Sequence, residues 1–215
     1  PTLSRLLIAI ATGIIAIGLV LSFTRAAWIS LAGVGLLFIA MKIGIKLKTL
    51  ISIGAIMTVV ICFNLDTLMV DLQRNKQDSS DNLTEHVKSI SNISSDDSNL
   101  ERLNRWSCAI SLFQERPITG WGPGTYQFVY APFQKSKLKT TISTNNADGG
   151  NAHSEYLGPL AEQGVLGALF VLMLILWASI VGFRLWNNVK NIEERNIAVS
   201  IYLGLMTYFI HGVLN

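Results

Sequence analysis

The sequence has few charged residues and few cysteines. Asp, Glu, Lys and Arg make up 14% of its 215 residues, against about 25% in a typical soluble domain. The formal charge of +3 is too small to indicate a nucleic-acid partner. Two cysteines provide neither a disulfide framework nor a metal-ligand spacing. The composition therefore argues against a soluble domain, a nucleic-acid-binding protein and a cysteine-based metal site.

Several motifs of common enzyme classes are also missing. The sequence has no His-Glu-x-x-His, no Gly-x-Ser-x-Gly and no glycine-rich phosphate loop with its lysine. The two other histidines, His86 and His211, are far from His153 along the chain, so no histidine pair for a metal is visible. We therefore expect no metal and no cofactor, and hydrolase or ATPase activity is disfavoured.

The sequence is instead rich in long uncharged blocks, and 50% of its residues are hydrophobic. About 20 apolar residues in a helix cross a hydrocarbon core of about 30 Å. The blocks predict five membrane spans: Leu6–Phe23, Ala26–Met41, Leu47–Leu65, Gly164–Phe183 and Asn196–Asn215. No strand-like alternation is convincing. We expect an all-α, polytopic helical membrane protein, and a piece of a longer chain.

Basic residues in the short loops predict the orientation of these spans. One loop holds Lys42, Lys46 and Lys48, and the other holds Arg184, Lys190 and Arg195. Short loops rich in Lys and Arg stay cytoplasmic. Both counts place the Arg25 turn and residues 66–155 on the far side, which is the periplasm in a Gram-negative cell.

Three regions follow from this orientation. Residues 1–65 form three spans with an external turn at Arg25, residues 66–155 form a large periplasmic loop, and residues 156–215 form two spans joined by a cytoplasmic basic loop. The predicted location is the bacterial inner membrane. No ATP or nucleotide sugar is present outside that membrane, so chemistry there must use substrates already activated in the lipid.

The large loop has two unlike halves. Residues 71–99 are dense in Ser, Asn and Asp, and we expect them to be mobile. Residues 100–155 are expected to be ordered. In Leu100–Gln114 the apolar side chains recur at helical spacing, which predicts an amphipathic helix that Pro117 ends: Leu103, Trp106, Ile110 and Phe113. The stretch Gly120–Tyr126 predicts a turn, with Trp121 and Tyr126 at the membrane interface.

Four side chains could bind a substrate or catalyse a reaction. Arg25 lies at a membrane boundary, where it either extends to the lipid headgroups or binds an anion through its planar fork. Arg102 and Arg105 lie on the amphipathic helix, where a solvated surface is the simpler interpretation. His153 lies where the loop re-enters the membrane and could accept a proton from a sugar hydroxyl, although a lone histidine at an interface is more often structural.

A set of motifs in this order resembles a known family. The segments are Thr24–Trp28, Arg102–Trp106, Arg116–Tyr126, Asn151–Leu157 and Leu160–Gly167. Together they resemble the core of the O-antigen ligase and polymerase superfamily. The resemblance covers the chain from about Ser22 to the C-terminus, except for residues 71–99. Ala26 stands where the family more often has glycine, and Ser154 stands where it often has asparagine.

The resemblance implies a glycosyltransferase. Such proteins take a glycan from undecaprenyl diphosphate and pass it to an acceptor hydroxyl, with inversion and without a metal. Arg25 and Arg102 match arginines thought to hold the diphosphate, and His153 matches the histidine assigned to acceptor activation. Arg105 is a further substrate-binding candidate without a clear counterpart in the family.

The acceptor stays open at this stage. A ligase to lipid A core, a polymerase of the repeat unit and a protein O-oligosaccharyltransferase would share these motifs. A transporter or a membrane sensor is the alternative from another class. Transporters usually carry polar residues or broken helices at the membrane midplane, whereas the first four predicted spans here show little of either.

Overall fold

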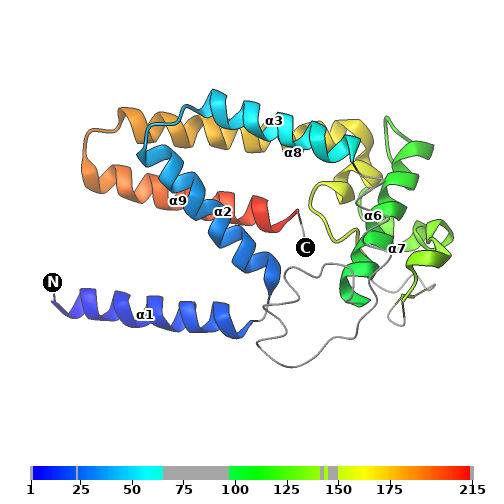
Figure 1. Ribbon diagram of the computed structural model, residues 1–215, viewed down its shortest axis with the longest axis horizontal. Coiled ribbons are helices and arrows are strands. Elements are labelled where there is room, and N and C mark those ends of the chain that lie inside the picture. The colour runs from blue at the N-terminus through cyan, green and yellow to red at the C-terminus, as the bar shows by residue number, and fades with distance from the viewer. Residues whose placement is uncertain (1, 23, 65–96, 141–142, 145–149, 214–215) are drawn as a thin grey trace.

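The structure, a computed structural model, consists of helices joined by loops (Figure 1). It describes residues 2–22, 24–64, 97–140, 143–144 and 150–213. Within these residues there is no strand, so the all-α prediction is confirmed. The expected mobile segment 71–99 lies outside the described residues except for 97–99, which begin a helix.

Each predicted span coincides largely with one helix. These helices are α1 (Thr2–Leu21), α2 (Arg25–Lys42), α3 (Leu47–Phe63), α8 (Leu157–Asn188) and α9 (Ile192–His211). Two stretches, Leu3–Leu21 and Leu157–Asn188, are long and apolar enough by themselves to cross a membrane. The prediction of a helical membrane protein is therefore confirmed at this level.

A small apolar core joins α2, α8 and α9. Val34 and Met41 of α2 are buried with Phe183 of α8 and with Tyr202 and Met206 of α9. Many Leu and Ile side chains on the outer faces of these helices are exposed, as a lipid-facing surface requires. The indole N–H of Trp28 in α2 donates a 3.1 Å hydrogen bond to the Leu19 carbonyl, which connects α1 to the group.

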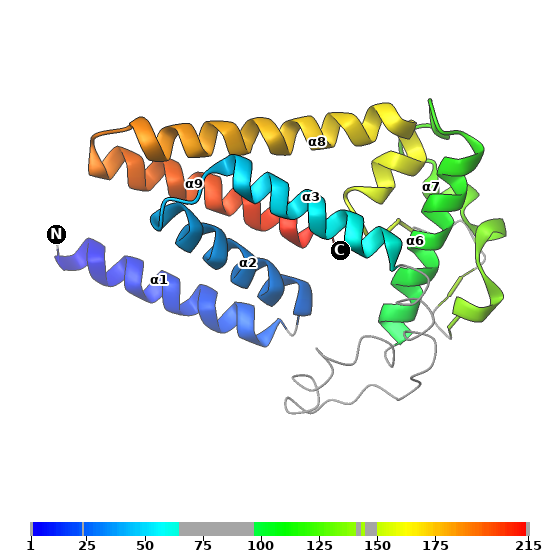
Figure 2. The ribbon, with the colours of Figure 1, turned by 45° about the horizontal axis from the view of Figure 1, so that its top comes forward.

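The two short basic loops lie at the same end of the helical group. Figure 2 shows both the α2–α3 and the α8–α9 connections at the end away from α6 (Asp97–Glu115). The Phe38 and Trp186 rings touch edge to face there, with Lys42 over one ring and Arg195 over the other. Short loops of like charge thus share one end, which is the relative arrangement that the charge pattern predicts.

At the opposite end, α6 packs against α8 and against the short helices η1 (Ala131–Phe133) and η2 (Ser136–Leu138). The short helix α7 (Tyr126–Val129) packs against α8 and η1. The predicted amphipathic helix is present and Leu103 is buried as expected, but the buried surface only partly coincides with the predicted face. Ile110, expected on the apolar face, is 43% exposed, whereas Cys108 and Leu112 are fully buried. The buried surface is wider because Tyr130, Gln134, Lys135 and Ser143 cover a second, largely polar side of α6.

Two glycines with positive φ fit the loop to the membrane helix. Gly120 (φ 65°) lies against the Glu162 backbone, where a Cβ would come within 2.3 Å of the Glu162 carbonyl carbon. Gly164 (φ 66°) breaks the regular geometry of α8, and its Cβ would lie 2.4 Å from the Ile118 carbonyl oxygen. Backbone hydrogen bonds from Gly122 N to Glu162 O (2.7 Å) and from Val165 N to Pro117 O (2.8 Å) complete the junction.

The aromatic residues of this turn differ from the interfacial role we predicted. Tyr126 is 2% exposed, and its ring stacks on that of Tyr130 at 5.3 Å. Trp121 is half-buried and donates its indole N–H to the Leu112 carbonyl at 3.0 Å. The prediction for Tyr126 was wrong because the turn folds inward onto α6.

Candidate functional site

The side of α6 that faces residues 126–135 and Ser143 carries buried polar residues. Glu101, Asn104 and Arg105 lie one helical turn apart or less, and each is at most 5% exposed. Buried charges and amides are costly unless they are paired or hydrogen-bonded. Their partners come from the loop that leads to His153, so this side of α6 organises the candidate site.

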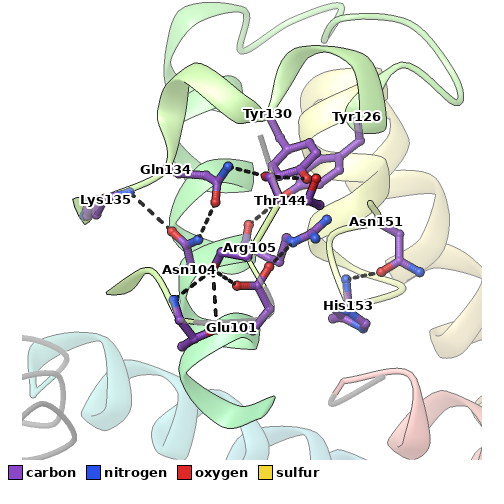
Figure 3. Close-up of polar contacts among 12 residues, drawn as sticks. Glu101, Asn104, Arg105, Tyr126, Tyr130, Gln134, Lys135, Thr144, Asn151 and His153 are labelled. Carbon is purple, nitrogen blue, oxygen red and sulfur yellow. Dashed lines mark hydrogen bonds and ion pairs between the residues drawn. The ribbon is translucent and has the colours of Figure 1, made fainter. Parts of the chain in front are cut away.

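Arg105 is at the centre of this polar group. Its Nε donates to Oε1 of Glu101 at 2.6 Å, and its guanidinium carbon lies 4.3 Å from the centre of the Tyr130 ring. The second carboxylate oxygen of Glu101 accepts a short hydrogen bond from the Ser143 hydroxyl. Figure 3 shows the guanidinium below the two stacked tyrosine rings, on the side of Asn151 and His153.

A second set of hydrogen bonds fixes Gln134, Lys135 and Thr144 on the same side. The Asn104 amide donates to Oε1 of Gln134 at 3.0 Å and accepts from the Lys135 backbone N–H at 3.2 Å. The carbonyl of Thr144 accepts from the Tyr130 hydroxyl (3.1 Å) and from the Gln134 amide (2.7 Å). These bonds satisfy the buried Asn104 amide, and they join the side chains of Tyr130 and Gln134 to the Thr144 backbone.

His153 follows this stretch in an unusual backbone conformation. Its φ of 47° is the one positive φ at a non-glycine position among the described residues. Its N–H donates to Oδ1 of Asn151 at 3.1 Å, and its carbonyl accepts from the Trp106 indole N–H at 3.0 Å. Strained conformations of this kind persist where neighbouring contacts impose them, often at functional sites.

The environment of His153 favours the neutral imidazole. Burial lowers the pKa of His153, the nearby Arg102 and Arg105 charges lower it further, and Glu101 opposes them. The largest cause is burial, which disfavours the charged ring. A neutral imidazole near pH 7 can accept a proton, as a general base must.

His153 opens onto a cavity of about 400 Å³ with a polar lining. The lining includes Tyr126, Gln127, Asn151, Glu155 and Glu162. The carboxylate of Glu162 accepts backbone N–H bonds from Gly124 (2.8 Å) and Tyr126 (3.0 Å), so it also holds the Gly120–Tyr126 turn. A cavity with hydrogen-bonding groups and an adjacent base can accommodate a hydroxyl-bearing substrate.

The structure brings three of the four predicted site residues to one region. Arg102 and Arg105 influence the His153 ring electrostatically, and both belong to α6. Arg102 is half-buried, whereas Arg105 is 5% exposed. Arg25 begins α2, but its side chain lies outside the described residues. Within those residues, no group of three or more His, Cys, Asp or Glu side chains could hold a metal.

Sequence reasoning missed several supporting residues. Glu101 and Arg105 are four residues apart, a spacing that permits an ion pair on one helix side, and this was the available signal. Nothing in the sequence indicated that Trp106 and Tyr130 would contact the His153 segment. Cys108 is buried as predicted, and burial raises the pKa of its thiol to about 11, so it remains a thiol. Cys62 has a side chain outside the described residues.

Comparison with known proteins gave one family. A family model described as O-antigen ligase matches residues 10–172, about three quarters of the chain. The match includes α6, the turn and His153, and it ends within α8. No curated protein and no solved structure matches the chain.

Proposed function

Since the chain belongs to the O-antigen ligase family, we propose that it transfers a glycan from undecaprenyl diphosphate to an acceptor hydroxyl. The reaction would serve ligation or polymerisation of a surface polysaccharide, with a glycan, lipid A core or a protein as acceptor. The observation that carries this proposal is His153, a half-buried imidazole at a polar cavity with its pKa lowered.

His153 is the proposed general base. A hydroxyl bound in the cavity gives its proton to the neutral imidazole as its oxygen attacks the anomeric carbon. The attack displaces the diphosphate from the opposite face, so the configuration inverts. The proton remains on the imidazole until solvent removes it.

Arg102 and Arg25 are the proposed diphosphate ligands. The leaving group gains negative charge as the glycosidic bond breaks, and guanidinium groups stabilise that charge through paired hydrogen bonds. Arg102 is half-buried on the helix that also positions His153. The start of α2 lies at the same end of the helical group as α6, which supports this role for Arg25 (Figure 2).

The site end of the molecule is proposed to face the periplasm from the bacterial inner membrane. This orientation rests on the shared position of the two basic loops at the other end. It gives the site access to a lipid-linked donor at the outer surface of the membrane.

A direct test uses the purified chain in lipid vesicles with a polyprenyl-diphosphate glycan and membranes of an acceptor strain. His153→Gln keeps a polar side chain of similar reach but removes the base. Transfer should fall by about 100-fold or more, within the range of general-base contributions. The matched control is Lys137→Gln at an exposed position of η2. Full transfer by His153→Gln would refute the proposed chemistry.

The acceptor is identified separately by complementation of ligase-null and polymerase-null strains. If the polymerase-null strain changes from single-repeat glycan to a full ladder, the chain is a polymerase. If the ligase-null strain regains glycan on lipid A core, the chain is a ligase. Modified proteins with no change in either strain indicate a protein O-oligosaccharyltransferase. Movement of the intact donor across vesicles without transfer would favour a transporter over an enzyme.

A further inference from the structure

Arg105 is too deeply enclosed to bind a substrate directly, as the sequence analysis had suggested. The side chain is 5% exposed, with Glu101 on one side and the Tyr130 ring on another. The backbone at Gly150 covers the remaining side so closely that a Cβ there would lie 1.9 Å from Nη1. A phosphate oxygen could not reach Nη1 of Arg105 without displacing Gly150.

The enclosure connects α6 to Ser143 and, at two points, to residues 150–153, which we call the His153 segment. Glu101 holds Ser143, Arg105 lies under Gly150, and Trp106 holds the His153 carbonyl. Residues 101, 105 and 106 occupy adjacent turns of one rigid helix. The contacts therefore fix Ser143, Gly150 and His153 relative to one element.

We propose that Arg105, ion-paired with Glu101, is a positioning residue that holds the His153 segment on α6 and does not contact the donor. The proposal rests on the proposed role of His153 as the base. A buried cation fits this task because its rigid fork and its ring stack set a single geometry. Nη1 has no hydrogen-bond acceptor among the described residues, so close packing under Gly150 holds it.

The same pair also acts on His153 through charge. Arg105 and Arg102 lower the pKa of His153, and Glu101 raises it, all three from α6. The other carboxylates at the cavity are Glu155 and Glu162. Replacing Arg105 by a neutral residue should raise the His153 pKa, and replacing Glu101 by a neutral residue should lower it. Loosening of the segment alone would raise the His153 pKa toward its ordinary value in both variants.

The test measures the His153 ring in the substrate-free, full-length protein. Carbon-13-labelled histidine in detergent micelles is titrated by NMR, with His153→Gln used to assign the signal. Arg105→Gln should raise the pKa and Glu101→Gln should lower it. Arg105→Lys keeps the charge, so it should leave the pKa near that of the parent while changing the ring chemical shifts. An unchanged His153 pKa in Arg105→Gln would overturn the proposal, because loss of the charge and release of the segment would both raise that pKa.

Kinetics with a purified polyprenyl-diphosphate glycan separate positioning from donor binding. Arg105→Lys should lower kcat by about 10- to 100-fold and leave the KM for the donor unchanged, because small displacements of a base are costly. A raised KM with kcat retained would mean that Arg105 contacts the donor, and the proposal would fall. Loss of activity in Arg105→Lys with continued activity in His153→Gln would instead contradict the proposed base.

Discussion

At the scale of single residues, His153 combines a rare backbone conformation with a half-buried ring. The Trp106 indole and the Asn151 amide oxygen hold the backbone, and His153 lines the cavity. A histidine held mainly for packing would not need a polar cavity beside it. The arrangement therefore favours the functional interpretation of this residue over the structural one.

The pH dependence of transfer follows from the lowered pKa of His153. The base is active when neutral, so transfer should be constant above the folded-state pKa and fall as pH drops through it. Burial and two arginines place that pKa below the ordinary 6.5. The acid limb of kcat/KM should therefore lie below pH 6.5, measured over a series of buffers at constant ionic strength. An acid limb above that value would contradict the assignment.

Arg25 provides a second residue-scale prediction. If its planar fork binds the diphosphate, Arg25→Lys should be nearly as damaging as Arg25→Ala, with a loss of about 10- to 100-fold in transfer. A lysine can still reach the headgroups, so an arginine that only anchors the helix would tolerate the change. Transfer rates at equal protein levels in the membrane distinguish the two. Near-parental activity of Arg25→Lys would mean that Arg25 anchors the helix at the headgroups and does not bind the diphosphate.

Transfer should also survive removal of divalent ions, because the proposed charge stabilisation comes from arginines. The measurement is transfer in the presence of EDTA, with and without added Mg²⁺. Loss in EDTA that one divalent ion restores would replace the arginine mechanism with a metal mechanism.

At the scale of elements, the position of the helices was predictable and the side they bury was not. Uncharged blocks and basic flanks predicted the five apolar helices, because lipid tolerates few other sequences. The polar side of α6 is buried only because Gln134, Lys135 and Ser143 supply partners that are distant in the sequence. Such pairing depends on tertiary contacts that no local pattern encodes.

The non-helical conformation of Gly164 within α8 could not be predicted, because it also depends on tertiary contacts. Glycine inside an apolar run looks ordinary, and its φ of 66° with ψ of −157° becomes necessary only because Ile118 packs against it. The family motifs identified the right segments for the site. They did not indicate that Gly120 and Gly164 join the loop to α8.

This junction gives an element-scale prediction on stability. Gly164→Ala should destabilise the protein by about 1–3 kcal/mol or more, because only glycine readily adopts that conformation and the Cβ would overlap the Ile118 carbonyl. Thermal unfolding in detergent, followed by circular dichroism, measures the loss. Gly35→Ala in α2 is the control, since a Cβ there meets nothing within 4 Å. Equal stability of the two variants would argue against the junction.

At the scale of the whole molecule, the arrangement of charge predicts sidedness. The short basic loops share one end, and α6 with the candidate site occupies the other (Figure 2). An impermeant thiol reagent applied to intact spheroplasts should therefore label Lys137→Cys and spare Lys46→Cys, both exposed positions. Permeabilised cells should label both. The parent chain measures background from its own cysteines, and the reverse pattern would refute the orientation.

The segment that carries His153 is also tied to the end of α9, and this has a consequence for biosynthesis. Glu155 donates its backbone N–H to the Gly212 carbonyl at 2.8 Å, and the Tyr156 hydroxyl donates to the Phe209 carbonyl at 2.7 Å. A ribosome adds roughly 5–20 residues per second, so these carbonyls are made seconds after His153. A nascent chain that has already inserted α8 still lacks them. Nascent chains arrested before residue 209 should therefore transfer no glycan, which an assay of stalled ribosome complexes with a lipid-linked donor would measure.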